Sequence, residues 1–199
     1  MLGKIIDILL ICSILSIFFI TGFGFGQHYK ANEVNASTLD LTQRIDNAHA
    51  QLKSMIKIKE LAYHLQHYNY KLSKFKAEYI ANLLEYSART QGVDYKLLSS
   101  VAITESHLDE TEISHKGAIG LLQIMPDTAY RFNFNPHKLK DIEYNILVGT
   151  TILGTMVDKY GENNGLRMFL CGETKGKLCW YHKDTNLYVN KILKIKETL

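Results

Sequence analysis

Apolar residues dominate the start of the chain and recur at helical spacing through most of the rest. Ile5 to Phe25 consists almost entirely of Ile, Leu, Phe and small residues, with Asp7 near its start. A run of this length is about long enough to cross a bilayer as a helix. It exceeds a usual signal-peptide core, and no Ala-x-Ala-like site follows it, although the Gly22–Gly26 tail leaves cleavage as an alternative. We expect residues 1–30 to form an N-terminal transmembrane anchor or uncleaved signal.

A sparse apolar stripe continues from about Asn35 to Leu72, in a segment without Pro or Gly that predicts one long helix. Its first half alternates spacings of four and three through Leu41, Ile45, Ala48, Leu52 and Met55. After a one-residue slip the alternation resumes at Ile58, Leu61, Leu65, Tyr68, Leu72 and Phe75. Such a narrow seam is typical of a coiled coil, but a helix packed back on the next domain has the same pattern. We therefore expect residues 31–75 to form a helical stalk, and residues 35–75 to pair as a homodimer, to bind an envelope-machinery partner, or to cover the following domain.

Residues 76–199 read as consecutive helices with no convincing strand. Stop and start signals divide them: Gly92 and Gly161 end helices, Asp94 caps one, and Pro126 opens another. The expected helices are Ala77–Gln91, one that carries Glu105, a short one after Pro126, Asn145–Tyr160, Asn164–Leu170, and a last one whose shared face holds Tyr188, Ile192, Ile195 and Leu199. The pattern predicts a mostly α domain, with any β-hairpin confined to the stretch between Ser106 and Leu121.

Composition narrows the classes of function. The chain has 46% hydrophobic and 22% charged residues, which is ordinary for a globular protein and argues against disorder. Its net charge of +3 comes without a strong Lys/Arg run, so we expect no nucleic-acid partner. The spacing of His107 and His115 from Glu105 does not match the ligand spacing of a known zinc motif. We therefore predict no metal.

Glu105 is the carboxylate whose position suggests a catalytic role. Leu98, Val101 and Ala102 precede it at spacings that put them on the same face of a helix. A charge on an apolar face is costly, so the group either finds donors, stays protonated, or lines a cleft that uses its raised pKa.

Three segments around Glu105 now support a comparison. They are Ala102–Ser106 (AITES), Ser114–Pro126 (SHKGAIGLLQIMP) and Asn145–Gly149 (NILVG). In order and spacing they resemble the catalytic domain of the SLT-type lytic transglycosylases, lysozyme-like enzymes that cut peptidoglycan. The resemblance covers roughly residues 80–195. It implies a lysozyme-like α-helical domain over 76–199 and says nothing about residues 1–75.

The resemblance also implies a mechanism. Glu105 would act as the single acid and base that cleaves the MurNAc-GlcNAc β-1,4 bond to give 1,6-anhydromuramoyl ends, with no cofactor. Substrate-binding positions would be Ser106, Gly120, Leu121, Gln123, Ile124, Phe169 and Tyr188. Ser106 is equally placed to bond a helix carbonyl, and Tyr188 to lie in the core. Asn145 would pack structurally.

The chain departs from the family at Met168–Gly172 (MFLCG), where the family usually has Ala-Tyr-Asn-Ala-Gly. The aromatic ring stays at Phe169 without its hydroxyl. Two other functions remain open: a muramidase or phage-type lysis protein, with a base among Asp109, Glu110 and Glu112, and a catalytically idle wall-binding or assembly protein.

Localisation follows from the substrate that the family implies. A weak charge bias, from Lys4 before the apolar run, favours a cytoplasmic amino terminus. We expect a single-pass inner-membrane protein with its catalytic domain in the periplasm. Disulfides persist outside the cytoplasm, so we expect Cys171 and Cys179 to pair.

Overall fold

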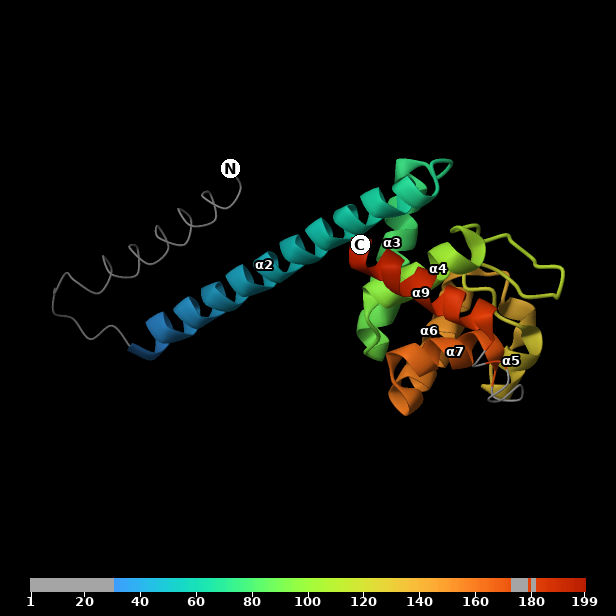
Figure 1. The fold of residues 1–199 in the computed structure, drawn as a ribbon. Coiled ribbons are helices and arrows are strands. Elements are labelled where there is room, and N and C mark those ends of the chain that lie inside the picture. The colour runs from blue at the N-terminus through green and yellow to red at the C-terminus, as the bar shows by residue number, and fades with distance from the viewer. Residues whose placement is uncertain (1–30, 173–178, 180–181) are drawn as a thin grey trace. The chain divides into compact units, whose positions relative to one another are not determined.

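The computed structural model describes residues 31–172, 179 and 182–199 (Figure 1). The expected anchor at residues 1–30 lies outside this range. Among the described residues, no helix has the length and apolar character that a membrane crossing needs. Contacts divide the chain into two units, Met1–Ala50 and Gln51–Leu199, and each is described by itself.

The long helix predicted from the stripe is α2, Ala31–Tyr68, and the two halves of the stripe have different surroundings. In the first half the apolar side chains are exposed, and Leu52 has 45% of its surface accessible. In the second half Leu61 and Ala62 are buried and Leu65 is 0% exposed. At 100° per residue, the two stripes lie about a third of a turn apart on the helix. The one-residue slip therefore marks the change from an exposed stripe to one that packs in the core of Gln51–Leu199.

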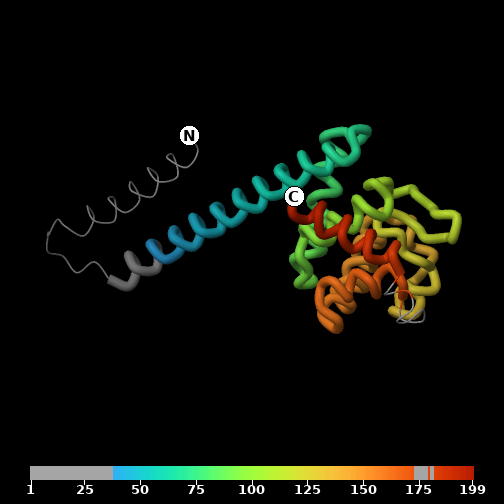
Figure 2. Tube along the Cα trace, in the orientation of Figure 1, coloured from blue at the N-terminus to red at the C-terminus, as the bar shows by residue number. Residues whose placement is uncertain are grey.

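The unit Gln51–Leu199 is built from helices around one core, and its described residues contain no strand. Its elements after α2 are α3 (Lys74–Gln91), α4 (Tyr95–Ser106), α5 (Pro126–Arg131), the 3-10 helix η1 (Pro136–Lys138), α6 (Ile142–Tyr160), α7 (Glu162–Cys171) and α9 (Lys183–Thr198). Helix α4 contacts α3 on one side and α9 on another, while α6 packs against α3 and α7. Figure 2 shows the C-terminal helix, in red, running beside the green segments. The mostly α architecture predicted from the sequence is confirmed.

Helix boundaries follow the capping residues. Ser73 caps α3, Gly92 ends it at a φ of 71°, and the Asp94 side chain accepts a hydrogen bond from the Lys96 amide at 2.9 Å. Helix α6 begins three residues before the predicted Asn145, because Asp141 accepts from the Tyr144 amide at 2.8 Å and so caps it earlier.

The stretch predicted to hold any β-hairpin contains only isolated bridges. Ile113 pairs with Ile119, and Ile119 pairs with Ile124. No hairpin forms among the described residues, and one of the two bridges reaches Ile124, three residues beyond the predicted stretch. The chain reverses at Gly120, with a φ of 76°, and at Gln123, with a φ of 48°, which brings Ile124 back beside Ile119.

Buried charge fixes α2 to α3 within Gln51–Leu199. Glu85 on α3 is only 4% exposed, and its carboxylate meets Lys57 Nζ of α2 at 3.3 Å and Arg89 Nε at 3.5 Å. A buried carboxylate without such partners would be strongly destabilising. The Lys57 pair therefore helps to specify which face of α2 packs against α3.

Candidate active site

Glu105 lies in the last turn of α4, between residues buried in the core. Ala102, Ile103 and Ser106 are buried, and the Glu105 side chain is partly buried. Desolvation by burial raises the pKa of Glu105 to about 7, against the smaller lowering effects of a hydrogen bond from Tyr188 and the charge of Lys191. A carboxyl group with this pKa is protonated in about half of the molecules at neutral pH, so it can both donate and accept a proton.

Tyr188 gives Glu105 its side-chain partner from a distant part of the sequence. The Tyr188 hydroxyl of α9 donates a hydrogen bond to Glu105 Oε1. Burial and the nearby Glu105 carboxylate raise the pKa of Tyr188 well above its usual value, so this hydroxyl keeps its proton. Glu105 thus has a fixed donor whichever protonation state it adopts.

Ion pairs hold α9 in the position from which Tyr188 reaches Glu105. Lys196 Nζ of α9 lies 3.0 Å from Asp94, the cap of α4, and 2.7 Å from Glu162 at the start of α7. Burial lowers the pKa of Lys196, but its hydrogen bonds to these two carboxylates outweigh that effect and raise it. The same residue therefore joins the helix of Tyr188 to the helix of Glu105.

The end of α4 turns sharply and is tied to two other segments. His107 and Leu108 have φ values of 51° and 67°, a left-handed conformation that ends the helix directly after Ser106. Asn69 Nδ2 donates to the His107 carbonyl at 2.8 Å. Ser106 Oγ donates to the Leu121 carbonyl at 2.8 Å. The Ser106 hydroxyl thus bonds the backbone of the next loop, and it also lies 3.3 Å from the Ala102 carbonyl of its own helix, the kind of contact that the sequence left as an alternative.

Asn145 holds that loop in place through two hydrogen bonds and makes a third to the segment before α6. Its Oδ1 accepts from the Leu122 amide at 2.9 Å, and its Nδ2 donates to the carbonyls of Ile119 at 2.8 Å and Leu139 at 3.0 Å. Gly120 is required beside it, because a Cβ there would lie 2.5 Å from Asn145 Nδ2. The loop can therefore approach α6 only without a side chain at position 120.

The remaining predicted loop residues take two roles. Leu121 and Ile124 are buried and anchor the loop in the core. Gln123 Nε2 donates to the Gly120 carbonyl at 2.9 Å and to the Glu112 carbonyl at 3.2 Å. Among the described residues nothing donates to Gln123 Oε1, which leaves this oxygen as an acceptor for a ligand.

Phe169, predicted to bind substrate, lies on α7 and packs partly buried against the core. Its ring cannot hydrogen-bond Glu105. The hydroxyl that reaches Glu105 comes from Tyr188 instead, so the chain keeps a tyrosine donor despite the altered run at residues 168–172.

Two of the three acidic residues after α4 have side-chain partners away from Glu105, and the third is exposed. Asp109 Oδ1 accepts from the Thr111 hydroxyl at 2.7 Å and from its amide at 2.9 Å, bonds that lower the pKa of Asp109. Glu110 forms an ion pair with Lys76, and the Glu112 side chain is exposed. In the described part of the chain, no cluster of His, Cys, Asp and Glu could hold a metal ion.

Cys171 and Cys179 are joined by a disulfide, with their Cα atoms 6.0 Å apart. The Thr185 hydroxyl of α9 donates to the Cys179 carbonyl at 2.7 Å. The bridge therefore links the end of α7 to the start of α9.

Sequence reasoning missed Lys191 and Asn69. Lys191 follows Tyr188 by three residues, a spacing that places the two on one face of a helix, and this was the available signal for its effect on Glu105. Asn69 had no signal, because its contact with His107 depends on how two distant segments pack.

Replacing Glu105 with Gln tests the raised pKa without an assay of activity. The native protein, with a pKa of about 7 in place of 4.5, holds a proton that the unfolded chain releases. The unfolding free energy of the wild type should therefore fall as the pH rises between these values, by up to about 3 kcal/mol. Glu105→Gln lacks this fall. Urea titrations should therefore show that the unfolding free energy of the variant, relative to that of the wild type, is higher at about pH 8 than at about pH 5.

Two controls sharpen that measurement. Tyr188→Phe removes a donor that lowers the pKa of Glu105, so the fall should extend to higher pH. Asp109→Asn removes a carboxylate whose pKa is lowered in the folded protein. The stability that this carboxylate contributes should be lost as the pH falls, which is the opposite pH dependence to that of Glu105. Parallel pH curves for wild type and Glu105→Gln would show that Glu105 has an ordinary pKa.

Comparisons with known proteins identify similar domains. The family model of the Transglycosylase SLT domain matches residues 82–171. A curated relative, membrane-bound lytic murein transglycosylase C of Haemophilus influenzae, is 28% identical over 152 residues, which are 68% of this chain and 40% of the relative. The chain thus spans less than half the length of that relative.

Two solved structures share the fold. The 70 kDa soluble lytic transglycosylase of Escherichia coli matches 71% of this chain and 28% of its own, with a TM-score of 0.54 and 17% identity. An inactive mutant of the lytic transglycosylase Slt of Pseudomonas aeruginosa matches 58% and 23%, with a TM-score of 0.50 and 18% identity. Residues 82–171 therefore match the Transglycosylase SLT domain, and the chain is similar to lytic transglycosylases.

Proposed function

We propose that the chain cleaves the MurNAc-GlcNAc β-1,4 bond of peptidoglycan with Glu105 as its single acid and base, leaving 1,6-anhydromuramoyl ends. The observation that carries this proposal is the partly buried Glu105 carboxyl group, whose pKa is raised to about 7 by desolvation. A glycosidic oxygen is a poor leaving group until it is protonated, and a carboxylic acid with this pKa still holds a proton near neutral pH.

In the proposed reaction Glu105 first donates one proton and then accepts one. Glu105 gives its proton to the glycosidic oxygen as the C1–O bond breaks, and the acetamido oxygen of the same sugar bonds to C1. The Glu105 carboxylate then takes the proton of the 6-hydroxyl while O6 bonds to C1 and displaces the acetamido oxygen. Glu105 ends protonated, and no water is consumed.

Tyr188 is the proposed positioning residue in both steps. Its hydroxyl donates to Glu105 Oε1, which leaves Oε2 to exchange the proton with substrate. A donor to the carboxylate also keeps the pKa of Glu105 from rising further. The proposed acceptor for the substrate is Gln123 Oε1, and an N-acetyl amide is a donor that this oxygen could bind.

The hydrolytic alternative requires a second carboxylate to activate water. Two of the three candidates have other partners, since Asp109 accepts from Thr111 and Glu110 pairs with Lys76, while the Glu112 side chain is exposed. This favours the single-carboxylate reaction over a muramidase. An idle wall-binding protein would need neither the raised pKa of Glu105 nor the Tyr188 bond, so these two features favour an enzyme.

The proposed location is the inner membrane, with the domain on the periplasmic side. Support comes from the apolar run Ile5–Phe25, from a relative whose name includes membrane-bound, and from the disulfide between Cys171 and Cys179, a bond that persists in oxidising compartments.

The proposed partner of the exposed stripe is a second copy of the chain. Ile45, Leu52 and Met55 follow the spacing of a coiled-coil seam, which is complementary to itself. All three side chains are exposed among the described residues. A paired stalk would bring two catalytic domains to one stretch of wall.

The first prediction concerns the products. Full-length chain in detergent, given purified peptidoglycan, should release muropeptides lighter by one water than hydrolysed fragments, as read by mass spectrometry. Glu105→Gln should release at least about 100-fold less, because a general acid typically contributes that much. Asp109→Asn is the matched control and should retain wild-type activity. Reducing ends in place of anhydro ends would identify a muramidase, and unchanged lysis by Glu105→Gln would exclude Glu105 as the catalyst.

The second prediction concerns location. After alkaline extraction of membranes from expressing cells, the chain should stay in the pellet, because a spanning helix resists high pH. Alkylation of the denatured, nonreduced protein should leave Cys171 and Cys179 unlabelled. Release into the supernatant, or labelling of both thiols, would contradict the proposed topology.

The third prediction concerns pairing. Ile45→Lys should shift the full-length chain from dimer to monomer in sedimentation velocity, because a charge in the seam is costly. Leu39→Lys is the control. Leu39 is more exposed, at 69%, and lies about half a turn from the seam, so this variant should stay dimeric. A monomeric wild type would exclude the second copy as the partner.

A further inference from the structure

The turn that ends α4 has a crowded backbone conformation. His107 and Leu108 are both left-handed, with φ values of 51° and 67°, and in that conformation a side chain comes too close to the backbone. Two such residues in succession persist only where their surroundings hold them. Leu108 is held by its side chain, which is 1% exposed in the core. The His107 side chain is exposed, so this residue is restrained instead through its backbone carbonyl.

That restraint comes from the residue that follows α2. Asn69 Nδ2 donates to the His107 carbonyl at 2.8 Å. Asn69 Oδ1 accepts from the Lys71 amide at 3.0 Å, which fixes the plane of the side-chain amide. Because this amide group has both an acceptor oxygen and an NH2 donor, one residue makes both bonds. The Asn69 side chain is therefore held in the orientation that the bond to His107 requires.

Asn69 is itself fixed to the body of the domain. Its backbone amide donates to the Leu65 carbonyl at 2.9 Å, and Leu65 is fully buried in the core. Gln66 Nε2 donates to the Leu72 carbonyl at 3.0 Å and closes the same turn from the side of α2. Asn69 thus restrains the end of α4 from a segment that is anchored in the core.

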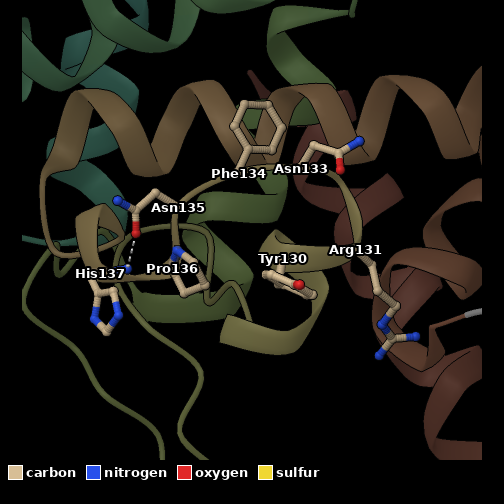
Figure 3. Close-up of a pocket in the computed structure, with 7 residues that line it drawn as sticks. All are labelled: Tyr130, Arg131, Asn133, Phe134, Asn135, Pro136 and His137. Carbon is tan, nitrogen blue, oxygen red and sulfur yellow. Dashed lines mark hydrogen bonds between the residues drawn. The ribbon is translucent and has the colours of Figure 1, made fainter.

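This contact is separate from the cavity shown in Figure 3. That cavity, of about 810 Å³, is lined by residues 130, 131 and 133–137, and neither Asn69 nor His107 is among them. Asn69 also lies before residues 82–171, the part of the chain that matches the Transglycosylase SLT domain. Its effect on the site therefore passes through the backbone of α4.

We propose that Asn69 is a positioning residue for Glu105: its bond to the His107 carbonyl holds the last turn of α4 and keeps the Glu105 carboxyl group partly buried. Glu105 lies two residues before His107, at the end of the same helix. Without the bond the left-handed turn relaxes, the end of α4 loosens and water reaches the carboxyl group. The inference rests on the proposed function, which gives Glu105 its role in catalysis. The end of α2 is then part of the catalytic unit.

The first test follows Glu105 without cleavage. Asn69→Ser keeps an oxygen that can accept from the Lys71 amide, but its side chain is too short to reach the His107 carbonyl. Water at the Glu105 carboxyl group lowers its raised pKa. In full-length Asn69→Ser the fall in unfolding free energy between about pH 5 and about pH 8 should therefore shrink by about half, as measured by urea titration. In a Glu105→Gln background the same substitution should not alter the pH dependence.

Tyr68→Phe is the matched control. It removes a hydroxyl from the neighbouring residue, where that group is hydrogen-bonded to Thr198 Oγ1 of α9 at 2.7 Å, and it should keep the wild-type pH dependence. A purely structural role for Asn69 would lower the unfolding free energy of Asn69→Ser equally at both pH values. That result would overturn the proposal.

The second test uses cleavage of purified peptidoglycan. Full-length Asn69→Ser should have a kcat about tenfold lower with KM unchanged, because the substrate keeps its contacts while the acid is displaced. The high-pH limb of the kcat profile should move to lower pH, since less of Glu105 is protonated at neutral pH. A wild-type profile, or an equal loss of activity at every pH, would contradict the positioning role. If wild type forms no product, the proposed function fails and the urea titrations still decide the role of Asn69.

Discussion

The desolvation of the Glu105 carboxyl group is the constraint on which the rest of the site depends. Burial at the end of α4 raises its pKa to about 7, and such a group is tolerated only where the neighbouring elements supply a donor. Tyr188 supplies it from α9, so α9 must stay fixed against α4. The ion pairs of Lys196 with Asp94 and Glu162, together with the buried side chains of Val189, Ile192 and Ile195, meet that need.

A second set of contacts builds the wall beside Glu105. Both polar atoms of the Asn145 side chain bond the backbone of the loop that Gly120 allows to approach, and Nδ2 also bonds the Leu139 carbonyl. Ser106 joins the same loop to α4 through the Leu121 carbonyl. The loop is therefore held from both sides with few side chains of its own, which leaves its outer edge, at Gln123 and Ile119, available to a ligand.

Helix α2 shows how one sequence pattern can have two outcomes. Leu61 and Leu65 pack in the core of Gln51–Leu199, while Leu52 and Met55 remain exposed. The one-residue slip rotates the second stripe away from the first by about a third of a turn. A coiled-coil seam and a domain-facing stripe both need apolar residues every three or four positions, so the spacing within either half does not distinguish them.

The sequence by itself determined most of the helices, several of their caps and the place of Glu105 on an apolar helix face, because these depend on residues close together in the chain. Asp94, Gly92 and Pro126 act within one turn of their helices, and the apolar neighbours of Glu105 precede it on the same helix. Only the tertiary structure decided that the hydroxyl on Glu105 comes from Tyr188, that Ser106 bonds the Leu121 carbonyl, and that Asp109 turns to Thr111. Tyr188 and Glu105 are 83 residues apart. No local pattern encodes such a pair, since their contact depends on how α4, α7 and α9 pack together.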